Sequence, residues 1–420
     1  MIANRILRQS RSALNMKTSI QAIATNSVLP WSYTAKTPSV GTLPQTNNDS
    51  LPALFRPLQI RSLVLKNRIV VSPMCTYSSE NGFLNDWHLV HLGQFAIGGA
   101  ALVIQEATAV QANGRITPYD AGLWMDEQME MTERIVRFIH SQNCAAGIQL
   151  AHAGRKASTK APFHQQPGDR TEPVYVTNKD GGWPDNVVGP SALPFAETYC
   201  TPKEISLEEI DQFKQNFVES VERAKKCDFD FLEIHAAHGY LLSEFLSPSS
   251  NKRTDDYGGS FENRIRLLLE LTSLVRQAWP STRPLSIRLS CEEWIGEDGW
   301  TITDTLRLIP QLVELGVDVI DTSSGGNSPC QRLPVPLEPG YQVPFSEAIK
   351  KSNYGARIMT APVGLITKAK QANDIIEQGH GDLVLIAREF LRDPHFPLRA
   401  ARELGVNEMS WAPQYQRAKQ

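Results

Sequence analysis

The stretch SLEEIDQFKQNFVESVERAKKCDFDFLEIHAAH, residues 206–238, contains the alternation that decides the fold. Its first part is amphipathic at helical spacing, and Ser206 with Glu209 three residues later forms the capping-box pattern that marks a helix start. Its last part, 230–238, is a short apolar run that ends in polar residues. A buried strand that passes into a loop has this pattern. We therefore expect a helix followed by a buried strand.

Similar units recur along the chain from Leu54 onward. Short β-branched runs end in polar or glycine residues, and most are followed by an amphipathic stretch such as 260–279. The expected strands are 68–74, 101–110, 145–152, 230–238, 285–290, 318–324, 357–364 and 382–388. Eight buried strands that alternate with helices predict an α/β fold, a single closed (β/α)8 TIM barrel. A doubly wound open sheet is the alternative, but no G-x-G-x-x-G follows the first strand.

Composition excludes several classes of protein. The 420 residues are 41% hydrophobic and 21% charged with a net charge of −3, so we expect no nucleic acid as a partner. The most apolar stretch, 92–105, is interrupted by Gln and a Gly pair, so we expect no membrane-spanning helix. The six cysteines are scattered without a C-x-x-C motif, which argues against a zinc or iron–sulfur framework and fits a reducing compartment.

Residues 1–50 differ from the rest of the chain. Asp49 is their first acidic residue, and it is preceded by Arg5, Arg8, Arg11, Lys17 and Lys36. This composition is typical of a mitochondrial transit peptide, and a disordered extension or a start codon placed too early is the other interpretation. We expect a cytoplasmic protein, with the mitochondrion as the alternative. The remainder divides into a barrel at 51–410 and a C-terminal tail at 411–420.

The active face of such a barrel lies at the C-terminal ends of its strands. The residues at these ends are Ser72-Pro73-Met74-Cys75, Glu106-Ala107, Gln149 and His152, His235 and His238, Arg288, Ser323-Ser324-Gly325, Pro362-Val363-Gly364, and Ala387-Arg388. A phosphate commonly binds at the loops after strands seven and eight, which here offer backbone N–H groups and Arg388. We therefore expect a phosphate-bearing ligand, planar and polar if Gln149 and Arg288 contact it.

The segment HAAHGY, residues 235–240, places two histidines three residues apart and a tyrosine two residues further on. The spacing alone fits a metal site, histidines packed in the core, or a device that binds and protonates a substrate. A zinc site would need at least one more close ligand, and the H-E-x-x-H pattern is absent. The histidines of WHLVHLG, residues 87–93, have helical spacing, and we interpret them as packing or surface residues.

The stretch 156–195, after the third strand, is a Pro- and Gly-rich insertion. Because it follows a strand, it lies on the active-site side, where long loops usually act as lids or substrate walls. A surface elaboration that does not contact substrate is the alternative.

Five long motifs follow one another along the chain: SPMCTYSSENG (72–82), EATAVQANGRIT (106–117), GIQLAHAGRKAS (147–158), EIHAAHGYLLSEFLSP (233–248) and NKRTDDYGGSFENR (251–264). Together they resemble the old yellow enzyme family of FMN-dependent ene-reductases, over residues 54–415. Cys75, with Tyr77 two residues later, resembles the thermophilic-like NADPH dehydrogenase subgroup, whereas yeast-type members carry Thr at the cysteine position.

The resemblance implies one non-covalent FMN, with NADPH or NADH as electron donor. The cofactor-binding residues that it implies are Ser72, Pro73, Met74, Cys75, Ala107, Gln149, Arg288, Ala387 and Arg388. Arg288 would face the flavin edge that becomes negative on reduction, and Arg388 would hold the phosphate. Ala387 stands where the family more often has Gly.

The resemblance also implies catalytic roles for His235, His238 and Tyr240, without a metal. Both imidazoles would donate hydrogen bonds to a carbonyl or nitro oxygen, and Tyr240 would protonate the α-carbon. Tyr77 and Arg417 would contact the substrate, with Arg417 reaching a neighbouring subunit's site in a homo-oligomer, a dimer or tetramer.

The implied reaction is ping-pong reduction of the activated C=C bond of a small-molecule enone-type substrate, an α,β-unsaturated carbonyl or nitro compound. Three alternatives are kept. They are a 2,4-dienoyl-CoA reductase-like flavoenzyme, a non-flavin metallohydrolase barrel that uses the histidine pair, and a flavin-binding protein without turnover.

Overall fold

The computed structural model describes residues 39–43, 51–165, 172–330 and 334–419, so most of the predicted extension at 1–50 lies outside the described residues. Eight strands form one sheet in the order β11-β10-β9-β8-β5-β4-β3-β12. Their bounds are β3 (Ile69–Val71), β4 (Leu102–Ala109), β5 (Ala145–Ala151), β8 (Phe231–Ala236), β9 (Leu285–Ser290), β10 (Val319–Ser323), β11 (Met359–Pro362) and β12 (Val384–Ile386). Each strand falls within a predicted one.

All the pairings in this sheet are parallel, and β12 pairs with β3, which brings the last strand next to the first. Between β11 and β12 the backbone N–H groups of Asp382 and Leu383 donate to the Thr360 carbonyl at 2.8 and 3.2 Å. The sheet is therefore nearly closed, which confirms the predicted single TIM barrel.

A short hairpin lies at the N-terminal side of the barrel. It consists of β1 (Leu58–Ile60) and β2 (Leu63–Leu65), which pair antiparallel. Ile60 and Leu65 belong to a buried apolar cluster with Leu102, Phe231 and other residues near the N-terminal ends of the strands. This side is therefore filled by apolar packing, and the polar site lies at the other end.

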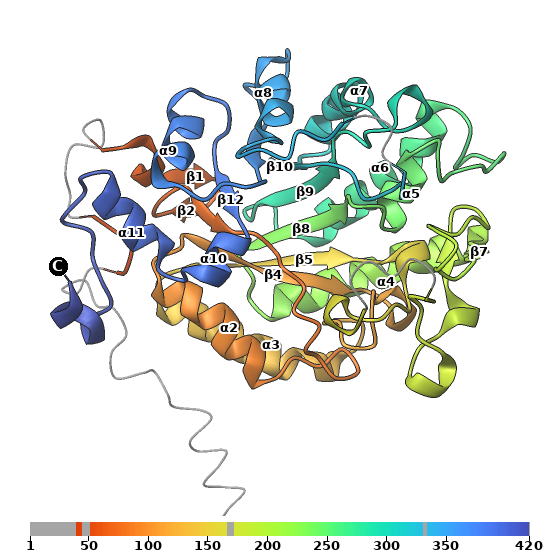
Figure 1. Ribbon diagram of the computed structural model, residues 1–420, viewed down its shortest axis with the longest axis horizontal. Helices are drawn as coiled ribbons and strands as arrows, with labels where there is room; N and C mark the ends of the chain where they lie inside the picture. Colours follow the sequence, from red (N-terminus) through yellow and green to blue (C-terminus); the bar gives the residue numbers. More distant parts are fainter. Residues whose placement is uncertain (1–38, 44–50, 166–171, 331–333, 420) are drawn as a thin grey trace, which may run out of the picture. The chain divides into compact units, whose positions relative to one another are not determined.

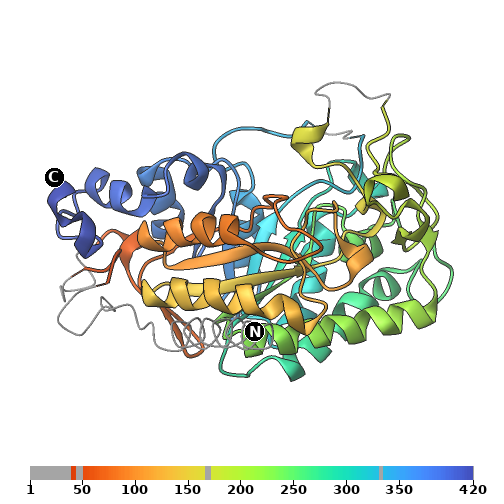
Figure 2. The ribbon, with the colours of Figure 1, turned by 90° about the horizontal axis from the view of Figure 1, so that it is seen from below.

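The helices lie outside the sheet, and Figures 1 and 2 show α2 and α3 running along one side of it. Their bounds are α2 (Asp86–Ile97), α3 (Met129–Ser141), α4 (Leu207–Lys226), α5 (Leu241–Leu246), α6 (Phe261–Ala278), α7 (Ile302–Glu314), α8 (Val343–Lys351), α9 (Ala369–Glu377), α10 (Arg388–Arg392) and α11 (Phe396–Glu403). In α4 the residues Ile210, Phe213, Phe217 and Val221 form the buried face. Burial of each such side chain contributes about 1.5–3 kcal/mol. Among the described helices none is long and apolar enough to cross a membrane.

The two histidines of α2 have structural roles. The Asn85 backbone N–H donates to His88 Nδ1 at 3.2 Å, which completes the cap of the helix. His91 stacks on Trp87 and meets Phe95 edge-to-face, with ring centroids 6.2 and 5.0 Å apart. The predicted packing role of these histidines is confirmed.

The predicted insertion separates β5 from α4, and Figure 1 shows it at the C-terminal end of β5. The segment from Gly154 to Glu204, which includes the insertion, contains the 3-10 helices η5 (Gly154–Lys156), η6 (Pro162–His164), η7 (Asn178–Asp180) and η8 (Pro184–Asn186), with the short parallel pair β6 (Val188–Gly189) and β7 (Lys203–Glu204). The other 3-10 helices are η2 (Ala53–Phe55), η3 (Ala112–Gly114), η4 (Asp126–Gln128), η9 (Gly296–Asp298) and η10 (Pro413–Ala418). The insertion therefore lies beside the candidate site.

Ser206→Ala tests the capping box that begins α4. The Glu209 N–H donates to Ser206 Oγ at 3.2 Å, and the Ser206 N–H donates to Glu209 Oε2 at 2.8 Å, as the sequence predicts. The loss of this cap should lower the free energy of unfolding by about 1 kcal/mol, whereas Ser206→Asn should keep most of it. Urea denaturation followed by circular dichroism measures both variants. Equal stability of Ser206→Ala and the parent would contradict the role of the cap.

Candidate functional site

The C-terminal ends of the barrel strands surround two hollows that contain several predicted site residues. A cavity of about 270 Å³ is lined by Ser72, Pro73, His238, Arg288, Ala387 and Arg388, together with Tyr341, Gln342 and Gly364. Ala107 and Tyr240 line a second, much smaller hollow. The structure therefore brings predicted residues from β3, β8, β9 and β12 to one end of the barrel.

A buried polar network forms the floor of the larger cavity. Arg288 Nη2 donates to Ser72 Oγ at 2.7 Å, and Arg288 Nε donates to Asp321 Oδ2 at 2.5 Å. Gln149 Nε2 donates to Glu233 Oε1 at 2.9 Å, and this carboxylate oxygen lies 3.8 Å from Arg288 Nε. Gln149 and Arg288, which the sequence places on separate strands, thus belong to one network.

Glu233 and Asp321 are site residues that the sequence analysis missed. Both carboxyl groups are buried, and burial raises the pKa of Asp321 to about 8 although Arg288 opposes this change. Burial likewise raises the pKa of Glu233 above its ordinary value. Glu233 lies two residues before His235 in β8, so the two side chains face the same side of the sheet. The signal in the sequence was a charged residue two positions before the predicted histidine, on the same face of the strand.

The rings of His235, His238 and Tyr240 form a cluster after β8. The His235 ring centroid lies 5.2 Å from that of His238 and 5.0 Å from that of Tyr240, with each pair nearly perpendicular. The Ala237 N–H donates to His235 Nδ1 at 3.3 Å, so the proton of a neutral His235 lies on Nε2. Burial, then His238 and Arg288, lower the pKa of His235 well below its ordinary value. His235 is therefore a neutral hydrogen-bond donor.

His238 is held by the neighbouring strands. Its backbone N–H donates to Ser290 Oγ at 2.8 Å, and its Nε2 lies 2.7 Å from Ser323 Oγ. When Ser323 donates to Nε2, the proton of the neutral ring lies on Nδ1. Burial lowers the pKa of His238 to about 3, so this ring is also neutral.

Gly239 is required between His238 and Tyr240. Its φ is 70°, and a Cβ at this position would clash with the carbonyl oxygen of Gly326. Only glycine adopts this conformation without cost and leaves room for the close approach of the backbone. The glycine thus permits the turn that brings Tyr240 back against His235.

Lys156 is another site residue that the sequence analysis missed. Its Nζ donates to the His238 carbonyl at 2.7 Å and to the carbonyl of Gly326, and it lies 5.6 Å from the Tyr240 ring centroid. Burial lowers the pKa of Lys156 to about 7. Burial also raises the pKa of Tyr240 well above its ordinary value, so its phenol is protonated at neutral pH.

The segment after β3 is fixed by a buried carboxyl group. The Thr76 N–H and hydroxyl donate to Glu106 at 3.1 and 2.8 Å, next to the half-buried Cys75. Burial, then Asp120 and Glu106, raise the pKa of the Cys75 thiol well above its ordinary value. The thiol is therefore neutral. Met74, also predicted to bind cofactor, is half-buried in the same segment.

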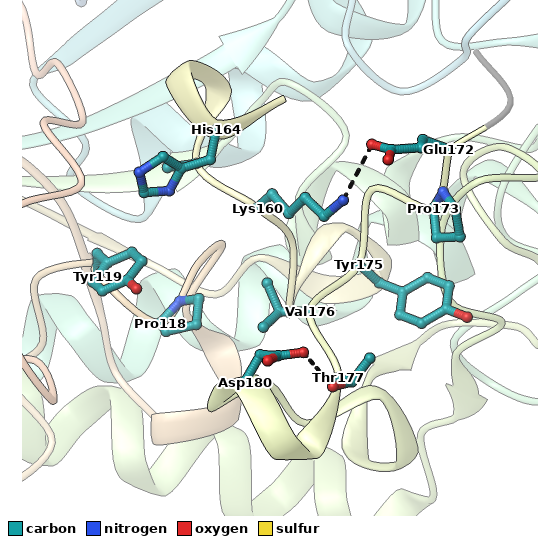
Figure 3. Close-up of a pocket in the computed structure, with 11 residues that line it drawn as sticks. Pro118, Tyr119, Lys160, His164, Glu172, Pro173, Tyr175, Val176, Thr177 and Asp180 are labelled. Carbon is teal, nitrogen blue, oxygen red and sulfur yellow. Dashed lines mark hydrogen bonds and ion pairs between the residues drawn. The ribbon is translucent and has the colours of Figure 1, made fainter. Parts of the chain in front are cut away.

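The insertion reaches the predicted substrate residue Tyr77 through Phe163, whose ring lies edge-to-face at 6.3 Å. It also forms most of the wall of a separate cavity of about 390 Å³. Figure 3 shows His164 and Tyr119 on one side of this cavity and Tyr175 on another. The insertion therefore contacts a residue that is predicted to bind substrate, and its role as a substrate wall or as a surface elaboration stays a prediction.

Arg417 lies apart from these hollows. It is exposed in η10, which is attached through the buried Ala412 and a ring contact of 6.1 Å between His395 and Tyr415. Arg417 lines neither the 270 Å³ cavity nor the hollow at Tyr240. Its contact with a neighbouring subunit stays a prediction.

The residues of the larger cavity fit FMN. Arg388, at the rim, suits a phosphate, and the Arg288–Ser72 floor suits the polar edge of a flavin ring. Gly364 has φ 124°, and a Cβ there would lie 2.9 Å from both Tyr341 and Gln342. A larger residue at this position would therefore fill part of the 270 Å³ cavity. Within the described ranges, no group of three His, Cys, Asp or Glu side chains is placed to hold a metal ion.

Comparison with known proteins gives consistent matches. Residues 53–407 match the model of the NADH:flavin oxidoreductase / NADH oxidase family. An NADPH dehydrogenase of Geobacillus sp. (strain WCH70) is 43% identical over 366 residues, which cover 87% of this chain and 98% of the relative.

Two solved structures show the same fold. The old yellow enzyme from Trypanosoma cruzi has TM-score 0.66 at 24% identity, over 84% of this chain and 92% of that one. A 2-naphthoyl-CoA reductase complex has TM-score 0.73 at 22% identity over 85% of this chain, which spans only 53% of the reductase chain.

Cys75→Ala tests whether the thiol contacts the cofactor. Since the neutral thiol lies in the segment that follows β3, its removal should shift the midpoint potential of bound FMN by on the order of 10–30 mV, equivalent to one lost hydrogen bond. Dye-equilibration titration measures the potential, and thermal unfolding should stay near that of the parent. Cys330→Ala, at an exposed position, is the matched control. Identical potentials and enone kinetics in Cys75→Ala and the parent would exclude a contact with the flavin.

Proposed function

Because the chain belongs to the NADH:flavin oxidoreductase / NADH oxidase family, we propose that it reduces the activated C=C bond of α,β-unsaturated carbonyl or nitro compounds. Its cofactor is FMN, and NAD(P)H is its electron donor. The supporting observation is the cluster of two neutral imidazoles and one protonated phenol after β8. Family membership also disfavours the alternative of a non-flavin metallohydrolase, since this is a family of flavin enzymes.

His235 and His238 bind the oxygen of the substrate. His235 Nε2–H donates to the carbonyl or nitro oxygen, and His238 donates from Nδ1 when Ser323 occupies its other nitrogen. Two hydrogen bonds withdraw electron density from the conjugated system and make the β-carbon electrophilic. When bound, FMN supplies the hydride that it has taken from NAD(P)H.

Tyr240 supplies the proton that completes the reduction. Its phenol stays protonated because the surroundings are buried, and it lies against His235, close to the bound oxygen. Transfer of the phenolic proton to the α-carbon, with hydride at the β-carbon, saturates the bond. Lys156 lies over the Tyr240 ring and stabilises the phenolate until solvent returns a proton.

His235→Ala and His238→Ala test the binding of the oxygen. A phenolate mimics the charge that develops on the substrate oxygen, so loss of one imidazole donor should weaken phenol binding by about 1.5–3 kcal/mol. Spectral titration of the flavin with a substituted phenol measures the affinity. His380→Ala, a partly exposed histidine at the end of α9, is the control and should bind phenol like the parent. Parent-like affinity in both site variants would rule out this role.

Tyr240→Phe separates the two half-reactions. Flavin reduction by NAD(P)H transfers no proton to a carbon, whereas enone reduction does, so only the second should slow, by roughly 10²–10⁴-fold. Phe keeps the ring contact with His235, so phenol binding should stay near normal. Stopped-flow absorbance, with reduction by NADPH and reoxidation by 2-cyclohexenone recorded separately, decides the question. Reoxidation at the parent rate would assign the proton to another donor, such as Tyr77 or water.

A further inference from the structure

Two carboxyl groups share one guanidinium in the floor of the cavity. Arg288 Nε lies 2.5 Å from Asp321 Oδ2 and 3.8 Å from Glu233 Oε1. The relative exposures of Asp321, Glu233 and Arg288 are 0%, 1% and 5%. The mechanism above uses neither carboxyl group, so their charge needs a separate explanation.

The charges of this cluster do not balance if both carboxyl groups are ionised. One guanidinium and two carboxylates would leave a net charge of −1 in a site shielded from water, and such an uncompensated buried charge is costly. A single proton shared by the two carboxyl groups makes the cluster neutral. Proton binding is therefore the least costly way to bury both groups.

The hydrogen bonds leave a position for this proton. Both oxygens of Glu233 accept hydrogen bonds, from Gln149 at 2.9 Å and from Ser286 at 2.9 Å. Asp321 accepts from Arg288 with Oδ2, but its buried Oδ1 has no hydrogen-bond partner among the described residues. The pair thus contains one unoccupied acceptor oxygen next to the guanidinium.

We propose that Glu233 and Asp321 together hold one proton while the site is oxidised and that this pair takes up a second, exchangeable proton when negative charge is added at the flavin edge that Arg288 faces. The inference rests on the placement of FMN over Arg288 under the proposed function. In this role both carboxyl groups are positioning residues, which act on the cofactor through Arg288.

Electrostatics determines whether the pair gains or loses a proton when the site is reduced. Added negative charge next to Arg288 disfavours ionisation of both carboxyl groups and raises their pKa values, so the pair binds more protons when the site is reduced. Two electrons and one proton enter as hydride from NAD(P)H. The additional proton comes from solvent, binds to a carboxylate oxygen, and returns to solvent when the electrons leave.

Other ionisable groups surround the pair, and some of them also change protonation state with pH. They are His235 on β8, His238 and Lys156 beyond the strand ends, Cys75 after β3 and Cys291 after β9. Burial keeps both histidines neutral and raises the pKa values of both thiols. The pKa of Asp321 is raised to about 8 and that of Lys156 lowered to about 7, so variants of the pair are needed to isolate it.

The midpoint potential of FMN in the holoenzyme, measured from pH 6 to pH 10, tests the inference. One additional proton per two electrons changes the ratio of reduced to oxidised enzyme tenfold per pH unit, which is about 30 mV per pH unit. Around pH 8 the midpoint potential of the parent should therefore fall with pH more steeply than that of Asp321→Asn or Glu233→Gln, by up to about 30 mV per pH unit. Asp318→Asn is the matched control, because Asp318 immediately precedes β10 and pairs with Arg61. Its midpoint potential should change with pH as steeply as that of the parent.

A parent slope equal to that of both pair variants would overturn the inference. If one variant fails to retain FMN, the other variant decides. A second measurement needs no variant: the reduced-minus-oxidised infrared spectrum of the parent at pH 8 to 9 should gain the C=O stretch of a protonated carboxyl group, and its absence would also overturn the inference. Failure of the proposed function is distinct, since it would appear as a protein without FMN or without enone reduction.

Discussion

The parallel register of β5, β8, β9 and β10 is the constraint on which the candidate site depends. It places Gln149 opposite Glu233, and it places Arg288 between His235 and Asp321. A shift of one residue in any of these pairings would turn the polar side chain to the other face of the sheet. The apolar cluster under the barrel, with the hairpin of β1 and β2, holds the strands in this register from the opposite end.

Burial then determines the charge of nearly every group at the strand ends. The cost of an ion away from water keeps the two imidazoles neutral, and the same cost moves the phenol of Tyr240 and the thiol of Cys75, which are ordinarily protonated at neutral pH, still further from ionisation. Neutral imidazoles can donate to an oxygen without releasing a proton, and a protonated phenol has a proton to give. The hydrogen-bonding roles proposed for His235, His238 and Tyr240 thus have one physical cause, which also explains why the carboxyl groups near Arg288 bind a proton.

The fold could be predicted from the sequence because its signals are local: apolar runs mark the strands, and Ser206 with Glu209 marks a helix start. Most strand-end residues followed from the same reasoning. Glu233 was missed although the alternation of β8 puts it on the face of His235. Lys156 ends the short 3-10 helix η5, and its position depends on packing against residues such as Phe195 and Gly326, which no local pattern indicates. The role of Arg417 depends on a second chain.

An exchangeable proton near Arg288 suits an enzyme whose pocket receives an electron donor and an electron acceptor in turn. A fixed, unpaired guanidinium would favour the negatively charged, reduced state of the cofactor and oppose its reoxidation by substrate. The carboxyl groups of Glu233 and Asp321 reduce this bias, because the one carboxylate charge that they carry offsets the guanidinium when the site is oxidised, and that charge is removed by a second proton when the site is reduced. The cluster then remains close to neutral in both halves of the cycle, so neither state is trapped. The second buried carboxyl group, which would be costly as a structural ion pair, is accounted for by this role.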